Sequence, residues 1–531
     1  MSVCRKNKKQ IVRGEIYISS TVTVIGKLKD LDTGLRYVKL SVTDGKDYTE
    51  AIVSRKQLYS DKGVLLSYGA NVTTFSHACK TLYEQENKLQ TECIYHNIGW
   101  SVQEGKRVFK AHRLYSSAEL TAEYQGALSI QPTGSFEAWQ SGIKQFAMPQ
   151  VPLQIAIATG VSALFEGMLA DELDSSLILH LKGDSSKGKT TFAMLALSVA
   201  CSPQSIEGNT LFCGWNSTNN FKLSLLRGNY GYPIVFDEIS QSNTNSLTSF
   251  VYDVANRQER GRLNSDSSQK KVGTWSTTVI STGEESLLDK CNLNKGLLVR
   301  VLELEFEQIT ANAHSAEALK SVIVNNYGQV YPKILEYIFE DDNRINQLRQ
   351  QYLEKRILLS EEIDVDNELV NRLIKHIAII VLSAEICSEV LDLDFDVEGI
   401  KQELFRAIKE QNKTYNPDET TAVLQFLNNT YLANTARYEI YERGSTVPRQ
   451  QSGYTVGYVQ KVNDGLMVYY NTNKFKDIVA ECPVGDSNRV LKLLEKGGYL
   501  KRDGDHRAKK RIINGNRLRV YEVFIPYNAL G

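Results

Sequence analysis

The sequence of 531 residues lacks a net charge, clustered cysteines and a long uncharged apolar run. Lysine and arginine together number 62, and so do aspartate and glutamate, which excludes a uniformly basic nucleic-acid coat but leaves room for local patches. The eight cysteines contain no CxxC pair, so a zinc site is disfavoured and reduced, buried thiols in a cytoplasmic protein are expected. The basic residues 1–17 lack the apolar run of a secretory signal.

One apolar stretch, residues 151–169, approaches the length of a membrane span. It carries Gln154, Glu166 and several small polar residues, so a buried helix is the better interpretation and no membrane partner is expected. A chain of this length exceeds what one hydrophobic core supports, and about three or four domains are expected.

Residues 1–120 read as a small N-terminal domain dominated by a sheet. Runs rich in β-branched and aromatic residues predict strands at 15–28, 34–44 and 47–55, followed by a helix at 70–89 and short strands within 92–112. Residues 121–150 read as a polar lead-in to the next core.

The pattern changes to strands alternating with helices from about 151 to 310. Nearly continuous apolar runs at 177–183, 232–238, 276–282 and 297–306 predict parallel strands buried on both faces. Residues 311–410 are mostly helical, 409–420 resemble a linker, and 421–531 form a separate unit. The predicted fold class is therefore multidomain α/β, with an α/β domain and helical lid at 121–410.

The stretch "GDSSKGKT" matches the pattern GxxxxGK[ST] at Gly183, Gly188, Lys189 and Thr190, between an apolar strand and a good helix. Such a loop turns backbone amides and a helix N-terminus towards phosphate oxygens, while the lysine reaches the β- and γ-phosphates. A chance glycine-rich turn is the alternative, and the flanking strand and helix disfavour it. The predicted ATP-binding residues are Gly183, Asp184, Ser185, Ser186, Lys187, Gly188, Lys189, Thr190 and Thr191.

An acidic pair, Asp237 and Glu238, ends the apolar run at 232–238. Placed about 50 residues after the loop, the pair completes Walker A and Walker B patterns. Thr190 and Asp237 are the predicted Mg²⁺ ligands, and Glu238 is the predicted general base that polarises the attacking water. The cofactors expected are ATP and Mg²⁺.

A basic hairpin is predicted at 260–275, just before the strand at 276–282. Its cations, Arg260, Arg262, Lys270 and Lys271, suit a phosphate backbone, although a solvated basic turn is the alternative. Thr282, at the end of the following strand, is the predicted sensor of the γ-phosphate.

Two arginines are candidates for contacts with a nucleotide. Arg300 begins the next predicted strand, a position from which an arginine can face the nucleotide of a neighbouring subunit. A structural ion pair is the alternative. Arg372, on the apolar helix that follows, is a candidate second phosphate sensor, with a structural role equally open.

The C-terminal unit 421–531 begins with three predicted helices and ends in two basic strands, the layout of a winged helix with its recognition helix at 486–496 and its wing at 501–523. Residues 489–519 hold eleven Lys or Arg and three acidic residues, a net charge of +8, so the remainder of the chain carries −8. Duplex DNA is the expected partner, and a protein-docking module is the alternative. The candidate DNA-binding residues here are Arg489, Lys492, Lys496, Lys501, Arg502, Arg507, Lys509, Lys510 and Arg511.

Several motifs occur together in the order typical of one family. They are "NIGWS", "SLILHLKGDSSKGKTT", "CGWNSTNNF", "FDEISQ", "VYDVANRQERGRL" and "VISTGEESL". Over roughly residues 95–400 the chain resembles the MCM-like AAA+ helicases of staphylococcal chromosome cassettes and pathogenicity islands.

This resemblance implies an AAA+ core in a homo-hexameric ring that encircles DNA and moves 3′ to 5′. It also implies that Lys270 and Lys271 contact single-stranded DNA in the pore and that Arg300 acts in trans. The family's sensor is typically asparagine, whereas this chain has Ser-Thr-Gly-Glu at 281–284.

The sequence thus predicts an ATP-dependent DNA helicase that replicates a mobile element, with priming left to a partner such as a primase or polymerase. One alternative is an ATP-switched replication initiator that does not unwind processively. Another is an AAA+ protein remodeller, which the basic, polar hairpin disfavours. The N-terminal domain is expected to serve as a collar or in a purely structural role.

Overall fold

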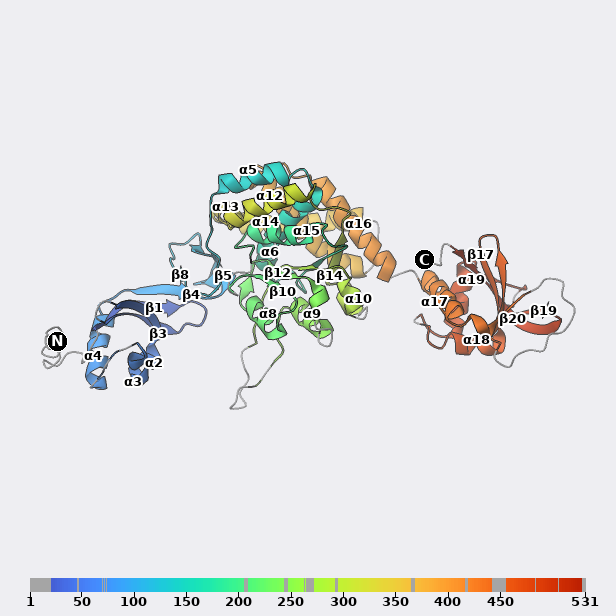
Figure 1. Cartoon of the computed structure of the whole chain (residues 1–531), viewed down its shortest axis with the longest axis horizontal. Coiled ribbons are helices and arrows are strands. Elements are labelled where there is room, and N and C mark those ends of the chain that lie inside the picture. Colours follow the sequence, from blue (N-terminus) through green and yellow to red (C-terminus); the bar gives the residue numbers. More distant parts are fainter. Residues whose placement is uncertain are drawn as a thin grey trace. The chain divides into compact units, whose positions relative to one another are not determined.

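The computed structural model describes most of the chain (Figure 1). The described residues are 21–44, 47–68, 70, 72, 74–204, 209–242, 247–261, 263, 272–291, 295–363, 368–415, 419–441, 455–482, 484–504 and 506–527. The contacts within the chain divide it into two compact units, Met1–Lys409 and Glu410–Gly531, which are described separately below.

The first unit begins with a five-stranded sheet in the order β3-β2-β1-β4-β8. Its strands are β1 (Thr21–Asp30), β2 (Arg36–Asp44), β3 (Asp47–Ser54), β4 (Thr91–Tyr95) and β8 (Glu123–Tyr124). The helices that accompany them are α2 (Arg55–Ser60), α3 (Lys62–Ser67) and α4 (Phe75–Glu86). Side chains from β1–β3 and from these helices form one buried apolar cluster, which explains the alternation of the strand sequences. The predicted strands at 34–44 and 47–55 are confirmed, and the helix predicted at 70–89 is present as the shorter α4.

A second, four-stranded sheet has the order β11-β5-β6-β7. It contains β5 (Ile98–Gln103), β6 (Lys106–Lys110), β7 (Leu114–Tyr115) and the short β11 (Asn229–Tyr230), which runs parallel to β5. At Gly99 the backbone has φ +89°, and a Cβ there would lie 2.0 Å from the carbonyl oxygen of Tyr230. The sheet therefore joins segments on either side of residue 120. Glycine is required at position 99 because the backbones of β5 and β11 come closest there.

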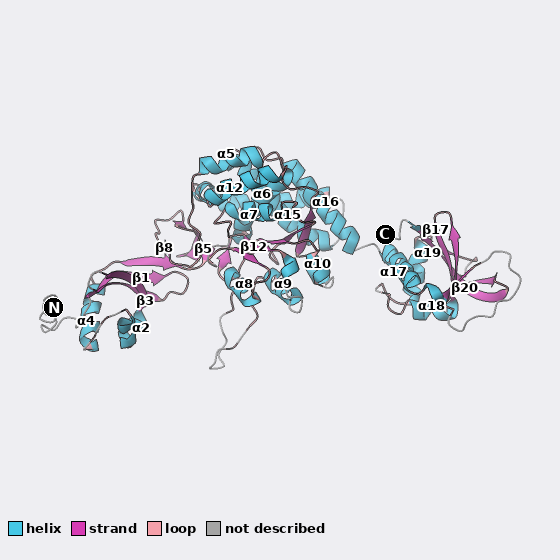
Figure 2. Ribbon diagram, viewed as in Figure 1, coloured by secondary structure: helices cyan, strands magenta, loops and turns pink. Residues whose placement is uncertain are grey.

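The central sheet is parallel throughout, with the order β10-β12-β13-β9-β14, and helices lie on both sides of it (Figure 2). Its strands are β9 (Ile178–Lys182), β10 (Phe212–Gly214), β12 (Ile234–Asp237), β13 (Val279–Thr282) and β14 (Val301–Glu305). The helices and turns between them are α7 (Lys189–Ser198), α8 (Asn219–Leu226), η1 (Ile239–Gln241), α9 (Leu247–Ala255), α10 (Leu287–Lys290) and α11 (Lys295–Leu298).

Parallel strands at the predicted positions confirm the α/β class, with two corrections. The apolar run at 297–306 is not all strand, because its first two residues close the helical turn α11 and β14 starts only at Val301. The three-residue strand β10 was not predicted, since it is too short to show a periodic pattern.

Helix α6 (Val151–Met168) is the apolar stretch identified above. It is the one helix among the described residues that is long and apolar enough to cross a membrane, with a mean hydropathy of 1.3, and 89% of it is buried inside the structure. Its Gln154 side chain donates to the carbonyl of Met148, and Glu166 pairs with His376, so both polar groups have partners inside the protein. These are the properties of a core helix, as predicted.

The segment 121–150 is more than a polar lead-in, because it contains the unpredicted helix α5 (Phe136–Phe146). The Ser135 hydroxyl caps this helix by accepting from the Ala138 amide, and Trp139 and Ile143 are completely buried. Five further helices complete the region: α12 (Ala313–Asn325), α13 (Val330–Phe339), α14 (Arg344–Glu362), α15 (Glu368–Leu391) and α16 (Val397–Tyr415).

Several cysteines serve as small apolar residues, in keeping with the expected free thiols. Five that the structure describes as unpaired are buried: Cys201, Cys213, Cys291, Cys387 and Cys482. Burial raises the pKa of the Cys213 thiol to about 12 and that of Cys291 to about 11, so neither is a ready nucleophile.

The second unit combines three helices with a six-stranded sheet, ordered β15-β16-β17-β20-β18, with β19 paired to β20. The helical elements are α17 (Glu419–Ala433), η3 (Thr435–Arg437), α18 (Thr472–Ile478) and α19 (Ser487–Lys496). The strands are β15 (Tyr438–Ile440), β16 (Gly457–Val462), β17 (Gly465–Asn471), β18 (Leu500–Lys501), β19 (Lys509–Ile513) and β20 (Asn516–Pro526). The three predicted helices and the final two strands are present, but β15, β16 and β17 were missed. The Asn-Asp-Gly turn at 463–465, between two apolar runs, was the available hairpin signal.

Candidate active site at the carboxyl edge of the parallel sheet

The glycine-rich loop connects the end of β9 to the start of α7. Its backbone enters the left-handed region at Gly183 (φ +136°), Ser186 (φ +64°) and Gly188 (φ +97°), conformations that favour glycine and give the loop its tight curvature. Lys189 is the first residue of α7, and only 8% of it is exposed. Its ammonium group donates to the carbonyls of Gly183 and Asp184, each at 2.7 Å, so the lysine lies across the loop.

The acidic pair follows the neighbouring strand β12 and meets the loop at the same edge. Asp237 Oδ1 accepts from the Thr282 hydroxyl at 2.5 Å and from the Thr190 hydroxyl at 3.4 Å. Burial raises the pKa of Asp237, and the hydrogen bond from Thr282 opposes that rise. Three elements, α7, β12 and β13, thus gather their polar ends at one point.

Thr190 and Asp237 are suited to Mg²⁺ because a hydroxyl and a carboxylate are the hard oxygen ligands this cation prefers. Their oxygens lie 3.4 Å apart, close enough for both residues to be candidate ligands of the same cation.

Glu238 has an unusual backbone conformation, φ +63°, directly after the strand. A left-handed conformation at a non-glycine residue is strained and is characteristic of functional positions. Its amide donates to the Thr282 hydroxyl at 2.9 Å, and its carboxylate accepts from the Ser240 hydroxyl at 2.6 Å. Thr282 therefore contacts both members of the acidic pair.

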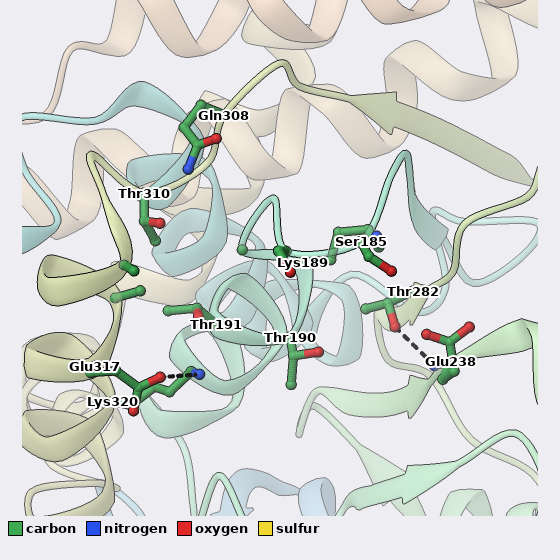
Figure 3. A pocket seen from close by; sticks show the side chains of 14 residues that line it. Ser185, Lys189, Thr190, Thr191, Glu238, Thr282, Gln308, Thr310, Glu317 and Lys320 are labelled. Carbon is green, nitrogen blue, oxygen red and sulfur yellow. Dashed lines mark hydrogen bonds and ion pairs between the residues drawn. The ribbon is translucent and has the colours of Figure 1, made fainter.

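A cavity of about 360 Å³ adjoins this cluster. Figure 3 shows Glu238, Thr282 and Ser185 at one end, Lys189 in the middle, and Thr191, Thr310, Glu317 and Lys320 at the other end. The residues that line it are Ser185, Ser186, Gly188, Lys189, Thr190, Thr191, Glu238, Thr282, Gln308, Thr310, Ala313, Ala316, Glu317 and Lys320. Those after β14 were not predicted from the sequence, because no local pattern links them to a loop more than 100 residues earlier.

A chain of hydrogen bonds behind the site fixes the segment that carries Thr282. Glu285 offers a carbonyl to His180 Nε2 at 2.9 Å, so this nitrogen carries the proton and Nδ1 accepts from the Ser281 hydroxyl at 2.9 Å. Trp215 Nε1 in turn donates to Ser281 at 3.0 Å. Burial lowers the pKa of His180, which keeps the ring neutral, as this arrangement requires. Trp215 lies in the quoted motif "CGWNSTNNF", but its role could not be read from the motif.

Arg300 lies at the opposite edge of the sheet from the loop of its own chain. Its carbonyl accepts from the Ile178 amide at the amino end of β9, whereas the loop follows the carboxyl end of that strand. A strand of five residues separates the two by about 16 Å. The Arg300 guanidinium donates to the Gly296 carbonyl at 2.7 Å and lies 5.6 Å from the Tyr252 ring centroid. It cannot contact a nucleotide held by its own chain.

Arg372 is not among the residues that line the cavity. It contributes to lowering the pKa of Asp174, a carboxylate that pairs with Lys375 at 2.6 Å and precedes the amino end of β9. Arg372 is therefore close enough to Asp174 to lower its pKa, and its role as a second phosphate sensor stays a prediction.

The predicted basic hairpin has a described base and a turn that lies outside the described residues. Its arms pair through Gln258 and Thr274, and the Glu259 amide donates to the Gly273 carbonyl at 2.9 Å. Arg260 pairs with Asp253 at 2.8 Å. The predicted cations Arg262, Lys270 and Lys271 all lie outside the described residues.

Many cations of the C-terminal unit are neutralised locally. Arg502 and Arg507 both pair with Glu495, at 2.6 and 2.8 Å, and Arg489 pairs with Glu419. Lys509 and Arg511 pair with Glu522, and Lys509 is only 9% exposed. The structure corrects the inclusion of Lys509 among DNA contacts, because its ammonium is buried against a carboxylate.

One face of the β19–β20 hairpin remains positively charged. Lys510 lies opposite Arg519, and Ile512 lies opposite Arg517, so these four side chains share a face of the two-stranded ribbon. All four are exposed, and within the described part of the chain the three cations form no ion pair. Lys492, Lys496 and Lys501 are also exposed. Arg517 and Arg519 were absent from the predicted contacts, although the alternation of "RLRV" contained the signal.

The fold and the site together define a multidomain α/β protein with a parallel sheet, whose carboxyl edge carries a glycine-rich loop and an acidic pair. The chain belongs to the family described as "Domain of unknown function (DUF927)", whose model matches residues 2–274, more than half of the chain. No protein with a curated description matches it.

A solved structure described as "SCCmec type IV Cch - active helicase" is similar to this chain. The two are 25% identical, with a TM-score of 0.72, and the match covers 96% of this chain and 94% of that chain. The likeness therefore extends across both compact units and is not limited to the central sheet.

Proposed function

We propose that this protein is an ATP-dependent DNA helicase that serves the replication of a mobile genetic element. The observation that carries the proposal is the meeting of Lys189, Thr190, Asp237, Glu238 and Thr282 at one edge of the parallel sheet. Similarity over nearly the whole chain to a structure described as an active helicase supports DNA unwinding as the use of this site.

Each of these side chains has a distinct task in ATP hydrolysis. The loop amides and Lys189 bind the phosphates, and Thr190 and Asp237 hold Mg²⁺, which neutralises the charge on the β- and γ-phosphates. Glu238 accepts a proton from the attacking water, and its carboxylate is held in place by the Ser240 hydroxyl. Thr282 fixes both acidic residues and lies where the γ-phosphate is expected.

A ring assembly of the AAA+ type is the form we propose for the motor. The strand order β10-β12-β13-β9-β14 and the position of Arg300 at the far edge of the sheet both support it. In a homo-hexamer, Arg300 is presented to the nucleotide of a neighbouring subunit, where its charge stabilises the transferring phosphoryl group. Movement from 3′ to 5′ is part of the same proposal and rests on the family resemblance alone.

Two surfaces are proposed to contact DNA. The basic hairpin at 260–275 contacts the single strand in the pore, and the C-terminal unit contacts the duplex as a winged helix. Helix α19 with the exposed Lys492 and Lys496, followed by the β19–β20 hairpin, supports the second assignment. Priming of synthesis is left to a partner primase or polymerase.

The test is ATP-dependent unwinding of forked duplexes with 3′ or 5′ tails, by the wild type and by Lys189→Ala. Lys409→Ala, which removes an exposed lysine at the end of the first compact unit, serves as the matched control. We expect unwinding by the wild type and the control alone. ATP hydrolysis without unwinding of either substrate would favour the switch-like initiator, and no hydrolysis at all would remove the helicase proposal.

A further inference from the structure

The cavity at the glycine-rich loop continues well beyond the groups proposed for phosphate chemistry (Figure 3). Glu238 and Thr282 line one end, so a γ-phosphate that reaches them leaves the rest of a nucleoside triphosphate to extend past Lys189 to the other end. That other end is walled by residues 308–320, which follow β14 and have no part in the roles proposed above.

The segment 308–310 is docked directly on the loop. The Ile309 amide donates to the Lys187 carbonyl at 3.1 Å, and a Cβ at Gly188 would lie 3.2 Å from Ile309 and 3.3 Å from Thr310. This close approach places Gln308 and Thr310 beside the start of α7, at the mouth of the phosphate site.

Thr310 is a buried polar residue whose hydroxyl has no partner within the described chain. It is 3% exposed, it lines the cavity, and it makes no hydrogen bond to any residue that the structure describes. The Thr310 hydroxyl is not one of the buried, unsatisfied side-chain atoms of the described chain, so it is open to the cavity, where a ligand group can accept a hydrogen bond from it or donate one to it.

Helix α12 presents a matching face to the same space. Ala313, Ala316, Glu317 and Lys320 follow the i, i+3, i+4, i+7 spacing of one helix side. The two alanines leave room for a flat ring, and Glu317 pairs with Lys320 at 2.8 Å while its carboxylate stays 74% exposed. An exposed pair of this kind is weak, so its carboxylate is free to accept hydrogen bonds from a ligand.

We propose that residues 308–320 form the subsite that binds the nucleoside half of the triphosphate. The Gln308 amide and the Thr310 hydroxyl contact the edge of the base, Ala313 and Ala316 pack on its plane, and Glu317 accepts hydrogen bonds from the ribose hydroxyls. This inference rests on the proposed ATPase function and adds the determinants of base and sugar recognition.

The test compares hydrolysis of ATP and 2′-deoxy-ATP by Thr310→Val, Ala316→Leu and Glu317→Gln. Gln347→Ala, at an exposed residue of α14 that does not line the cavity, is the control. We expect Thr310→Val and Ala316→Leu to raise KM for ATP by about tenfold with kcat nearly unchanged, since they remove binding that ground state and transition state share. Glu317→Gln should reduce the preference for ATP over 2′-deoxy-ATP.

Inorganic tripolyphosphate, used as a competitor, separates the two halves of the site. Its inhibition constant should be unchanged in Thr310→Val and Ala316→Leu, whose only loss is at the nucleoside end. Equal weakening of ATP and tripolyphosphate would show a general distortion and overturn the inference, as would unchanged KM in both variants. Hydrolysis that survives Lys189→Ala would instead overturn the proposed function, so the two failures are distinguishable.

Discussion

The hydroxyl of Thr282 is hydrogen-bonded to both members of the acidic pair, donating to Asp237 Oδ1 at 2.5 Å and accepting from the Glu238 amide at 2.9 Å. One side chain at the end of β13 therefore fixes the position of a carboxylate and of the backbone at the end of β12. The threonine hydroxyl thus serves as a donor and as an acceptor in the same place.

Replacing Thr282 tests this relationship. We expect Thr282→Ala to lower kcat for ATP by about 100-fold, because Asp237 loses a hydrogen bond and the Glu238 backbone is released. Thr282→Ser keeps the hydroxyl and should stay within a few-fold of wild type. The measurement is steady-state ATP hydrolysis, with melting temperatures to establish that both variants fold. Equal losses in the two variants would contradict the hydroxyl's role.

Replacing Glu238 should impair ATP hydrolysis without impairing nucleotide binding. Glu238→Gln removes the proton acceptor but keeps the shape and the contact with the Ser240 hydroxyl. We expect hydrolysis to fall by at least about 100-fold while ATP affinity stays within a few-fold, since a general base acts only on the chemical step. Calorimetric titration with a non-hydrolysable ATP analogue supplies the affinity. A parallel loss of binding would place Glu238 in ligand binding instead.

Substitution of Arg300 tests whether each nucleotide site is built from two neighbouring subunits. Arg300 lies about 16 Å from the loop of its own chain. The substitution Arg300→Ala should therefore abolish hydrolysis by removing an arginine from the nucleotide site of a neighbouring subunit. We expect a loss of about 1,000-fold in homogeneous Arg300→Ala. Mixing it with inactive Lys189→Ala should restore part of the activity, since some interfaces then contain both intact residues. Failure of every mixing ratio to restore activity would argue against a site shared between subunits.

Substitutions in the C-terminal hairpin can distinguish cations proposed to contact DNA from cations that form internal ion pairs. Lys510→Ala and Arg519→Ala should each weaken duplex binding and reduce the slope of log affinity against log salt by about one. Lys509→Met should leave that slope unchanged, because Lys509 is buried against Glu522. Fluorescence anisotropy on a labelled duplex at several salt concentrations measures both. The same slope for Lys510→Ala as for the wild type would remove this face from the interface.

A buried lysine in α8 predicts a pH dependence of stability. Lys222 is 2% exposed, donates to the Trp215 carbonyl at 3.0 Å and lies 4.7 Å from the ring centroids of Trp215 and Phe250. Burial lowers its pKa from an ordinary 10.5 to about 8.

The unfolded chain therefore binds more protons than the folded one between these values, and stability should rise as pH increases through that range. The gain is at most about 3 kcal/mol. The variant Lys222→Met lacks this gain in stability. The difference in melting temperature, wild type minus variant, should therefore increase from pH 7 to pH 10. A difference that stays constant would contradict the buried charge.

The loop and the acidic pair could be found in the sequence because the chemistry proposed for them restricts both residue type and spacing. The loop at 183–190 needs glycines, a lysine and a threonine in a fixed order, and the acidic pair must end an apolar strand. Strands β9, β12 and β13 followed from long buried runs. Thr282 could be selected because it ends the strand that the topology places beside β12.

Other features depend on partners far away in the chain and left no local pattern. The cavity wall that contains Thr310 and Glu317 depends on the packing of α12 beside α7. Lys509 was counted among the cations available to DNA, but its charge is neutralised by Glu522. Helix α5 was missed because its apolar face is short, although Ser135 marks its start.

The pairing of β11 with β5 constrains the order in which this protein can mature on the ribosome. Gly99 and its neighbours emerge more than 100 residues before Tyr230. In the folded protein the backbone of Gly99 packs directly against the backbone of Tyr230. Until that later segment leaves the exit tunnel, one edge of the β5–β6–β7 sheet is an unpaired template for other strands. Fragments that end between residues 125 and 228 retain that open edge, and they should aggregate more readily than the full chain.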